Sequence, residues 1–562
     1  MIILGISAYY HDSSACIIKD GNIIAAAQEE RFSRIKHDSS YPHKAIEYCI
    51  QEAGNPPVDK YVFYENPELK YDRVYKNLCS FPQSYSKFKK SIQSQKDRIS
   101  KTSHMEYVDH HKSHAASAFY PSPFQKSAIV TIDGVGEWST TTISSGFKNV
   151  ISPITSLDYP DSLGLLYSAF TYFCGFRVNN GEYKLMGLAP YGEPTYYRKI
   201  IDNLIDIRPD GSFALNLEYF GFYNSDVIIN KRFEKLFGFP RREQESELTK
   251  EYANIAASIQ KVTEEVVFNI CRYAKNITGY KNLCLAGGVA LNCVANGKIQ
   301  KSGLFDNIWI QPAAGDAGGA LGAALHYYYS IGNERTVSPN SMQSTYLGPN
   351  YDHGILDFLR SNDIKYSKMS IEEVAAQLSN EKVVGWFQGR MEFGPRALGH
   401  RSILGDARSS KMQSIMNLKI KFRESFRPFA PIVLQEDCNQ YFDLDVESPY
   451  MLLVSQVKKG ILKEHQRPES FDLIKDVNIE RSELPAITHV DNSARVQTVD
   501  ENNDLLYDLL KSFKKITGVG VLINTSFNVR GEPIVCTPED AYNCFKNSGM
   551  DYLVLGEYMI EK

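Results

Sequence analysis

The feature that most constrains the fold is a pattern of strand, polar loop and second strand that occurs twice along the chain. Residues 2–7 are apolar and β-prone, and after the polar cluster at 11–14 the hairpin signal Asp20-Gly21 leads into a further strand. The apolar run 127–133 is followed by a glycine loop and then by the β-prone residues 139–144. This repetition predicts a duplicated α/β core.

The length of the chain predicts more than one domain. Its 562 residues exceed what a single hydrophobic core usually organises. Apolar residues at spacings of three and four predict a long helix over 251–275, and residues 282–286 read as a buried strand. Residues 331–352 are rich in turn formers and lack periodicity, so we expect domains at 1–340 and 341–562.

Charge and composition narrow the function classes. The formal net charge is −4 and the estimated pI is 6.3, which argues against a broad basic surface for nucleic acid. No apolar stretch approaches the ~20 residues that a membrane helix needs, and the first residues do not resemble a secretory peptide. The ten cysteines include no CxxC pair, so neither a zinc ribbon nor a redox motif is signalled. We therefore expect a cytoplasmic protein without a membrane partner.

Two histidines and two aspartates form a candidate metal site. His110 and His114 are four residues apart in a segment that favours helix, so both imidazoles share one helix face, as two cis metal ligands require. Histidines at this spacing also occur as ordinary surface residues, and His111 is expected to point elsewhere. Asp133 ends an apolar strand, and Asp316 lies among glycines, positions where stability rarely needs a carboxylate. Such a donor set suits iron, manganese or zinc.

Glycines after a buried strand give a second candidate site. Gly287-Gly288 follows the strand predicted at 282–286 and precedes a predicted helix. Backbone amides there could cradle phosphate or adenosine, or the glycines could serve tight packing of strand against helix. The spacing alone leaves both interpretations open.

Cations concentrate at one point of the C-terminal half, which is not basic as a whole. Lys419, Lys421, Arg423 and Arg427 fall within nine residues, interleaved with phenylalanines. Such focused charge suits a polyphosphate ligand, because lysine and arginine bind phosphate oxygens, whereas the alternative is a solvated basic face. The interleaved aromatic residues favour a partly buried site.

Seven motifs in a fixed order resemble one enzyme family, the NodU/CmcH/TobZ-type O-carbamoyltransferases. The resemblance covers essentially the whole chain, and the ordered set is far more specific than any single motif. The motifs are HDSSA (11–15), EERFSRIKHD (29–38), HHKSHAASAF (110–119), TIDGVGEW (131–138), GEYKLMGLAPYG (181–192), GGVALN (287–292) and PAAGDAGGALGAAL (312–325).

For the N-terminal half, the resemblance implies a duplicated actin-like ATPase (ASKHA) domain, akin to the TsaD proteins of tRNA threonylcarbamoylation. It implies a metal, which is iron in that family, and a carbamoyl-adenylate beside it. His11 matches the family's proposed general base, a role that suits imidazole because its pKa lies near neutrality. The matching metal ligands are His110, His114, Asp133 and Asp316, and the matching carbamoyl-adenylate residues are Lys36, Gly288 and Asn292.

For the C-terminal half, the pairs Lys421-x-Arg423 and Ser526-x-Asn528 resemble the nucleotide site of YrdC-like α/β domains. The resemblance implies that this half converts carbamoyl phosphate and ATP, with Mg²⁺, to carbamoyl-adenylate. The residues expected to bind these ligands are Arg396, Lys421, Arg423, Arg427, Arg495, Asn524, Ser526 and Asn528.

The leading hypothesis is therefore ATP-dependent carbamoyl transfer to a hydroxyl of a small molecule, such as a sugar or natural product. Two alternatives are threonylcarbamoyl-type transfer to tRNA, which the acidic balance disfavours, and an actin-like nucleotide switch without enzymatic activity. Residues between about 64 and 101, and between about 199 and 249, show little of the family pattern. They are candidates for recognition of the acceptor, because variable loops often carry specificity.

Overall fold

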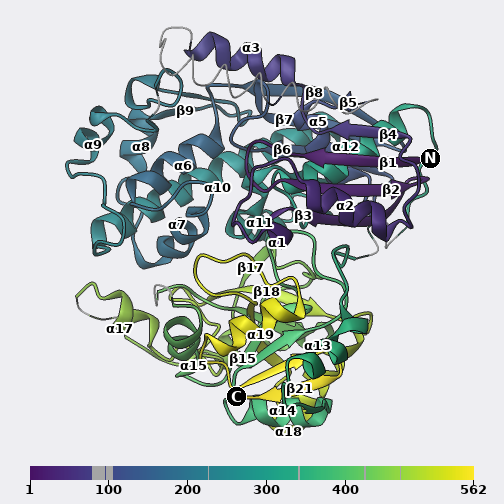
Figure 1. Ribbon diagram of the computed structural model, residues 1–562. Coiled ribbons are helices and arrows are strands. Elements are labelled where there is room, and N and C mark those ends of the chain that lie inside the picture. The colour runs from purple at the N-terminus through teal and green to yellow at the C-terminus, as the bar shows by residue number, and fades with distance from the viewer. Residues whose placement is uncertain are drawn as a thin grey trace. The chain divides into compact units, whose positions relative to one another are not determined.

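The computed structural model divides the chain into two compact units (Figure 1). The first comprises Met1–Glu29 and His37–Ser344, and the second comprises Glu30–Lys36 and Thr345–Lys562. The short segment Glu30–Lys36 thus comes from the N-terminal sequence but packs within the second unit. The residues that the structure describes are 1–78, 95, 105–225, 227–338, 342, 344–422, 426–466, 468 and 470–562.

The first unit contains two five-stranded sheets of the same topology. Their orders are β3-β2-β1-β4-β5 and β8-β7-β6-β11-β12, and in each sheet an antiparallel meander of three strands is extended by two parallel strands. The strands of the first are β1 (Ile2–Ser7), β2 (Ser14–Lys19), β3 (Asn22–Gln28), β4 (Lys60–Phe63) and β5 (Met105–Tyr107). Those of the second are β6 (Lys126–Ile132), β7 (Ser139–Phe147), β8 (Val150–Asp158), β11 (Asn282–Ala286) and β12 (Asn307–Ile310).

This repeated topology is the duplicated actin-like fold, and the predicted duplication is confirmed. The strands start as the sequence indicates: β1 and β11 match the predicted ranges 2–7 and 282–286. The predicted hairpin is present, since Asp20 and Gly21 both have positive φ, as a tight two-residue turn requires.

Two helices in equivalent positions of the halves pack tightly on each other. Helix α5 (His110–Phe119) follows β5 and packs on the second sheet, whereas α12 (Ala317–Ser330) follows β12 and packs on the first. The backbones approach so closely that a Cβ added at Gly322 would lie 1.8 Å from the carbonyl oxygen of Ser113. Because only glycine permits this approach, the N-terminal ends of the two helices are held together.

The remaining helices of the first unit surround these sheets. The predicted helix 251–275 is the core of α10 (Lys250–Thr278), whose C-cap residue Gly279 has a φ of 64°. The others are α2 (His43–Glu52), α3 (Pro67–Leu78), α6 (Leu163–Phe173), α7 (Glu182–Leu188), α8 (Tyr197–Asn203), α9 (Lys231–Phe237), η3 (Gly288–Leu291) and α11 (Cys293–Lys301). A small two-stranded sheet joins β9 (Ile205–Ile207) to β10 (Phe213–Leu215).

The second unit is built on one mixed sheet in the order β13-β21-β20-β14-β15-β19-β16-β18-β17. Its strands are β13 (Ser367–Lys368), β14 (Val384–Phe387), β15 (Arg401–Asp406), β16 (Ala430–Leu434), β17 (Leu453–Gln456), β18 (Ser493–Val499), β19 (Val521–Ser526), β20 (Tyr552–Leu555) and β21 (Tyr558–Glu561). Its helices include α1 (Glu30–Ser33), α13 (Ile355–Ser361), α14 (Ile371–Ser379), α15 (Met412–Ile415), α16 (Cys438–Tyr441), α17 (Leu473–Val477), α18 (Asp504–Thr517) and α19 (Pro538–Lys546).

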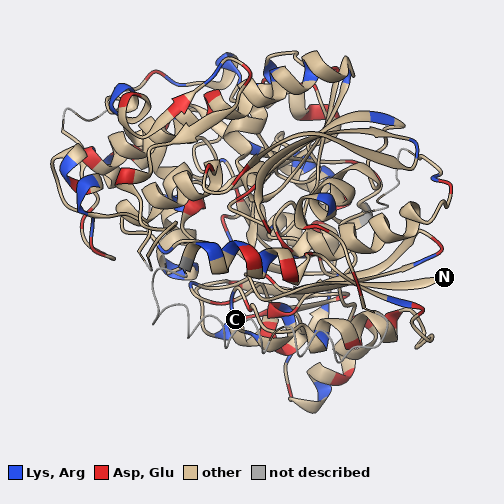
Figure 2. Cartoon of the chain, turned by 90° about the horizontal axis from the view of Figure 1, so that it is seen from above, with Lys and Arg blue, Asp and Glu red and all other residues tan. Residues whose placement is uncertain are grey.

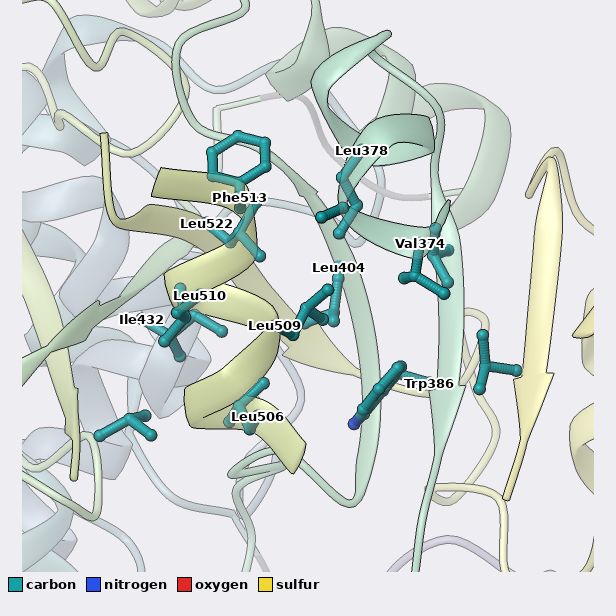
Figure 3. Packing of buried hydrophobic residues seen from close by; sticks show 14 of the residues in the cluster. Val374, Leu378, Trp386, Leu404, Ile432, Leu506, Leu509, Leu510, Phe513 and Leu522 are labelled. Carbon is teal, nitrogen blue, oxygen red and sulfur yellow. The ribbon is translucent and has the colours of Figure 1, made fainter. Parts of the chain in front are cut away.

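The core of the second unit lies between this sheet and the helices α14 and α18, which pack on each other (Figure 3). Leu506, Leu509 and Phe513 face the sheet from α18, at the spacing of three and four that an amphipathic helix requires. Trp386 of β14 is fully buried among them. This core fixes the strands whose ends carry the candidate phosphate-binding residues.

Among the residues described, no helix has both the length and the apolar character that crossing a bilayer demands. Acidic and basic residues are interspersed along the helices and loops (Figure 2), in keeping with the small net charge.

Candidate functional site

Helix α5 begins at the first histidine of the candidate metal site. The carboxylate of Glu137 accepts the backbone N–H of His110, with both oxygens 3.0 Å from the nitrogen. A carboxylate at a helix N-terminus is favourable because it satisfies unpaired amides and complements the helix dipole. Glu137 also accepts the N–H of Asn66, and it thereby fixes where the helix starts.

The two imidazoles of α5 converge on one point. His110 and His114 lie one turn apart, both are buried, and their Nε2 atoms are 3.0 Å from each other. Two nitrogens each about 2.1 Å from one ion, at about a right angle, would also lie about 3.0 Å apart. The spacing of the rings therefore fits two cis ligands of a single metal ion.

Both predicted carboxylates reach the same point. Asp133, directly after β6, places Oδ2 2.9 Å from Nε2 of His110 and 3.6 Å from Nε2 of His114. Asp316, directly before α12, places Oδ1 3.8 Å from Nε2 of each of these histidines. The structure thus brings together four residues that are spread over more than 200 positions, and the close packing at Gly322 explains how.

One residue of this cluster was predicted wrongly. His111 was expected to point elsewhere, but its Nε2 lies 3.1 Å from Oδ1 of Asp133 and its Nδ1 lies 2.7 Å from Oγ1 of Thr131. A helical wheel separates His111 from His110 by about 100°, yet Asp133 has two oxygens and contacts both. His111 therefore orients the Asp133 carboxylate, and the sequence signal was the histidine doublet itself.

The pKa values reflect the crowding of these groups. Burial opposes the charged form of His110, but the hydrogen bond to Asp133 and the negative charges of Asp316, Asp133 and Glu137 together outweigh burial and raise the pKa of His110 to about 9. Burial, reinforced by the neighbouring His110, lowers the pKa of His114. Although burial alone would raise the pKa of Asp133, the surrounding histidines hold it well below its usual range. The cluster thus favours one positive charge between its nitrogens and carboxylates, as a bound cation would supply.

His11 lies in the loop between β1 and β2 and extends this cluster. Its Nδ1 lies 3.0 Å from Oδ2 of Asp12, whose other oxygen is 2.8 Å from Nδ1 of His37. Its Nε2 lies 3.8 Å from Oδ2 of Asp316, so this carboxylate faces both the metal-site histidines and His11. Burial would lower the pKa of His11, but Asp316 and Asp12 outweigh it and raise the pKa to about 10.

The two glycines of the pair Gly287-Gly288 have different roles. A Cβ at Gly287 would lie 2.3 Å from the carbonyl oxygen of Ile132, so Gly287 serves tight packing. A Cβ at Gly288 would meet nothing within 4 Å, so its backbone is open to a ligand. The amide of Asn292 is engaged by the protein, because Oδ1 caps α11 at Ala295 and both amide atoms bond to Gln260. Lys36 lies in the segment that packs within the second unit.

In the second unit, Lys421 is buried and bound by protein oxygens. Its Nζ donates to the backbone carbonyl of Ser526, and it lies 3.0 Å from both Oδ1 and the carbonyl oxygen of Asn528. Ser526 Oγ in turn donates to Asn528 Oδ1 at 2.8 Å. Lys419 is exposed, so the predicted cation cluster is divided between a buried and a solvated face, and Arg423 lies outside the described residues.

The other predicted phosphate ligands are arranged around β19. Asn524 donates through Nδ2 to Gln497 Oε1 at 2.8 Å and to the carbonyl oxygen of Ala397 at 3.1 Å. Arg396 directly precedes Ala397, and Arg495 lies on β18 two residues before Gln497, hence on the same face. The backbone of Arg427 accepts hydrogen bonds from Gln413 and Asn417.

The segment Glu30–Lys36 holds two loops of this site, a role that sequence reasoning missed. Arg31 donates to the carbonyl oxygen of Gly394 at 2.9 Å, in the loop that carries Arg396. Arg34 donates to the carbonyl oxygens of Ile534 and Pro533 at 2.7 and 3.1 Å, in the loop that follows Asn528. Phe32 packs against Met391, Ile534 and Cys536. The two arginines therefore act as a brace on both loops.

Comparison with known sequences covers nearly the whole chain. Residues 2–325 match the carbamoyltransferase N-terminus, and residues 375–562 match the carbamoyltransferase C-terminus. An uncharacterized protein of Synechocystis is 53% identical, over 100% of this chain and 96% of that protein. Nodulation protein NolNO of Sinorhizobium fredii is 35% identical, over 99% of this chain and 80% of that protein.

Similarity to solved structures is weaker. HypF of T. kodakarensis matches with a TM-score of 0.32 and 13% sequence identity, over 60% of this chain and 49% of that chain. The fold assignment therefore rests on the strand order, and the family assignment rests on the sequence matches. Because both halves match the same enzyme family in order, the chain belongs to the carbamoyltransferase family and is a carbamoyltransferase.

Proposed function

We propose that this enzyme makes carbamoyl-adenylate from carbamoyl phosphate and ATP and transfers the carbamoyl group to a hydroxyl of a small molecule. The observation that carries the proposal is the convergence of His110, His114, Asp133 and Asp316 beside His11 in a chain of this family. We assign the transfer step to residues 1–340 and the activation step, in a YrdC-like domain, to residues 341–562. Both donors are cytoplasmic metabolites, so we assign the reaction to that compartment.

In the activation step, water releases carbamate and phosphate from carbamoyl phosphate. A carbamate oxygen then attacks the α-phosphorus of ATP, the bond to the β-phosphate oxygen breaks, and pyrophosphate leaves. Lys421, Arg396, Arg427 and Arg495, together with Arg423, would neutralise the phosphate oxygens, with Mg²⁺ bound to the nucleotide. Asn524, Ser526 and Asn528 would supply neutral hydrogen bonds. A mixed anhydride with AMP supplies a leaving group that carbamate lacks.

The metal that the family implies fits the donor set of the first unit. The ligand atoms of His110, His114 and Asp316 lie within 4.8 Å of one another, and Asp133 Oδ2 lies 2.9 Å from Nε2 of His110. Such donors suit iron, manganese or zinc, and we propose iron. When bound, the ion would polarise the carbamoyl carbonyl and neutralise Asp316, one of the carboxylates that raise the pKa of His11. His111 would keep Asp133 oriented through its bond to the second carboxylate oxygen.

In the transfer step, the acceptor oxygen attacks the carbamoyl carbon and AMP leaves with the electrons of the broken C–O bond. We assign to His11 the removal of the hydroxyl proton at Nε2, because Asp12 accepts the proton on Nδ1 and thereby fixes the tautomer. The open backbone of Gly288 would lie against the adenylate, with Asn292 as a further contact. The role of Lys36 toward the adenylate stays a prediction from the family resemblance.

The test is pyrophosphate release and ATP–pyrophosphate exchange by the purified chain, with and without carbamoyl phosphate. We expect exchange that depends on carbamoyl phosphate and is lost in Lys421→Ala. Exchange that does not need carbamoyl phosphate, or that survives in Lys421→Ala, would contradict the assigned donor or site.

A further inference from the structure

A buried arginine that has no ion-pair partner among the described residues contacts Tyr10, the residue before His11. Arg73 of α3 is only 7% exposed. Its Nη2 lies 3.4 Å from the hydroxyl of Tyr10, the residue directly before His11, and its guanidinium lies 5.2 Å from the centre of the Tyr159 ring. Its Nε has no hydrogen-bond partner, and in the described part of the chain no carboxylate lies within 4.0 Å of it.

The neighbouring charges do not compensate Arg73. Glu65, which precedes α3, is bound by Lys70, whose Nζ lies 2.6 Å from Oε1 and 4.5 Å from the centre of the Tyr10 ring. Both residues are buried, so the negative charge of Glu65 is matched by Lys70. The cluster of Lys70, Glu65 and Arg73 therefore carries one unbalanced positive charge, and an unpaired buried charge destabilises a fold.

The position of Arg73 near His11 indicates the role of its charge. Tyr10 and His11 have their ring centres 6.3 Å apart and nearly perpendicular, and His11 faces Asp316 of the metal site. Tyr64, which precedes Glu65, lies 3.5 Å from Asp316 through its hydroxyl. The cluster is thus continuous with the site at which the acceptor hydroxyl must be bound if His11 takes its proton.

We propose that Arg73 binds an anionic group of the acceptor, so that the acceptor is a hydroxyl compound bearing a carboxylate or a phosphate. Arg73 is suited to this because guanidinium pairs with carboxylate or phosphate through two parallel N–H donors, and its Nε–H is free to join. The hydroxyl of Tyr10 and the ring of Tyr159 contact the guanidinium and hold its orientation. The reaction is the one described above: the acceptor oxygen gains the carbamoyl carbon, AMP leaves and the proton passes to His11.

This inference rests on the proposed function, and three probes test it on the full chain: glucuronate, glucose 6-phosphate and neutral glucose. The measurements are the melting temperature with each probe and transfer of labelled carbamoyl from carbamoyl phosphate and ATP. We expect one anionic probe to raise the melting temperature and to be carbamoylated at least tenfold faster than glucose. Which probe succeeds distinguishes carboxylate from phosphate.

The variant Arg73→Met separates binding from structure, with Arg232→Met at an exposed site as its control. Because Arg73 is an unpaired buried charge, we expect Arg73→Met to melt no lower than the wild type while losing the response to the anionic probe. A lower melting temperature with unchanged transfer would assign Arg73 a purely structural role and overturn the inference. So would equal carbamoylation of the anionic probe by wild type and variant, or no stabilisation by either anion.

ATP–pyrophosphate exchange measured on the same samples keeps the two claims apart. Normal exchange with no preference for anions overturns only the inference about Arg73. Absent exchange in the wild type overturns the proposed function, and the inference with it.

Discussion

The two units differ in what their buried ionisable side chains contact. In the first unit, His110 and His114 point their Nε2 atoms at each other at 3.0 Å, with Asp133 and Asp316 beside them. One small cation bound by these four side chains would balance their negative charge. In the second unit, the ammonium of Lys421 is already bound by oxygens of Ser526 and Asn528.

The difference shows that the two sites are prepared in different ways. The first is preorganised, because closely packed helices and strands hold its side chains at one point, and such a site gains affinity from rigidity. The second is satisfied by the protein itself, so a phosphate must displace at least one oxygen from Lys421. We therefore expect the first site to fail completely when one ligand is lost, and the second to depend on how its loops are held.

Loss of metal should be the largest effect. His114→Ala removes one of two converging nitrogens, and we expect the affinity for the ion to fall by more than about 100-fold. Metal analysis of protein purified without oxygen gives the readout, with His43→Ala, at an exposed position, as control. A wild-type chain that holds no ion, or a His114→Ala chain that holds as much as the wild type, would contradict the preorganised site.

Lys421→Ala tests the second site. We expect carbamoyl-phosphate-dependent exchange to fall by roughly 100- to 1,000-fold, because a charge that stabilises the transferred phosphate is lost. Lys419→Ala is the matched control, since Lys419 lies two residues away and is exposed. If the two variants lose exchange equally, the solvated face and not the buried lysine binds the nucleotide.

The brace on the two loops should have an intermediate effect. Arg34→Gln removes the hydrogen bonds to Pro533 and Ile534, so the loop after Asn528 loosens, and we expect the KM for ATP to rise roughly tenfold with a smaller change in kcat. Arg360→Gln, at an exposed position of α13, serves as control. An unchanged KM in Arg34→Gln would show that the loops hold their positions without the brace.

The smallest effect concerns a cap in the first unit. Asn292→Ala removes the N-cap of α11 and leaves the Gln260 amide short of a partner, at a cost of about 1–3 kcal/mol in unfolding free energy. Chemical denaturation measures this loss. Asn292→Ser can retain the cap, so we expect it to lose less stability. If it also transfers carbamoyl at the wild-type rate, Asn292 has no direct role toward the adenylate.

Local patterns predicted the elements of this fold well. The ranges of β1 and β11 and the core of α10 follow from runs of apolar residues and from their spacing, which depend on neighbours in sequence. The duplication was visible for the same reason, because each half repeats the strand and loop pattern.

The sites were predicted less completely because they depend on contacts distant in sequence. Nothing local indicates that Gly322 brings Asp316 to His110, or that Arg73 of α3 reaches Tyr10. His111 was misplaced because a helical wheel ignores the second oxygen of Asp133. The sequence predicted that the cations near Lys421 form one cluster. In the structure, Lys419 is exposed to solvent whereas Lys421 is buried in the protein.

Whether activation and transfer use separate sites is decided by ATP–pyrophosphate exchange in the variant Asp316→Asn. This substitution removes a charge that faces both His11 and the histidines of the candidate metal site, all of which belong to the first unit. We expect exchange within about twofold of the wild type, because every residue assigned to the activation step is unchanged, whereas Lys421→Ala loses roughly 100- to 1,000-fold. If exchange disappears in Asp316→Asn while the protein stays folded, both reactions take place in one site.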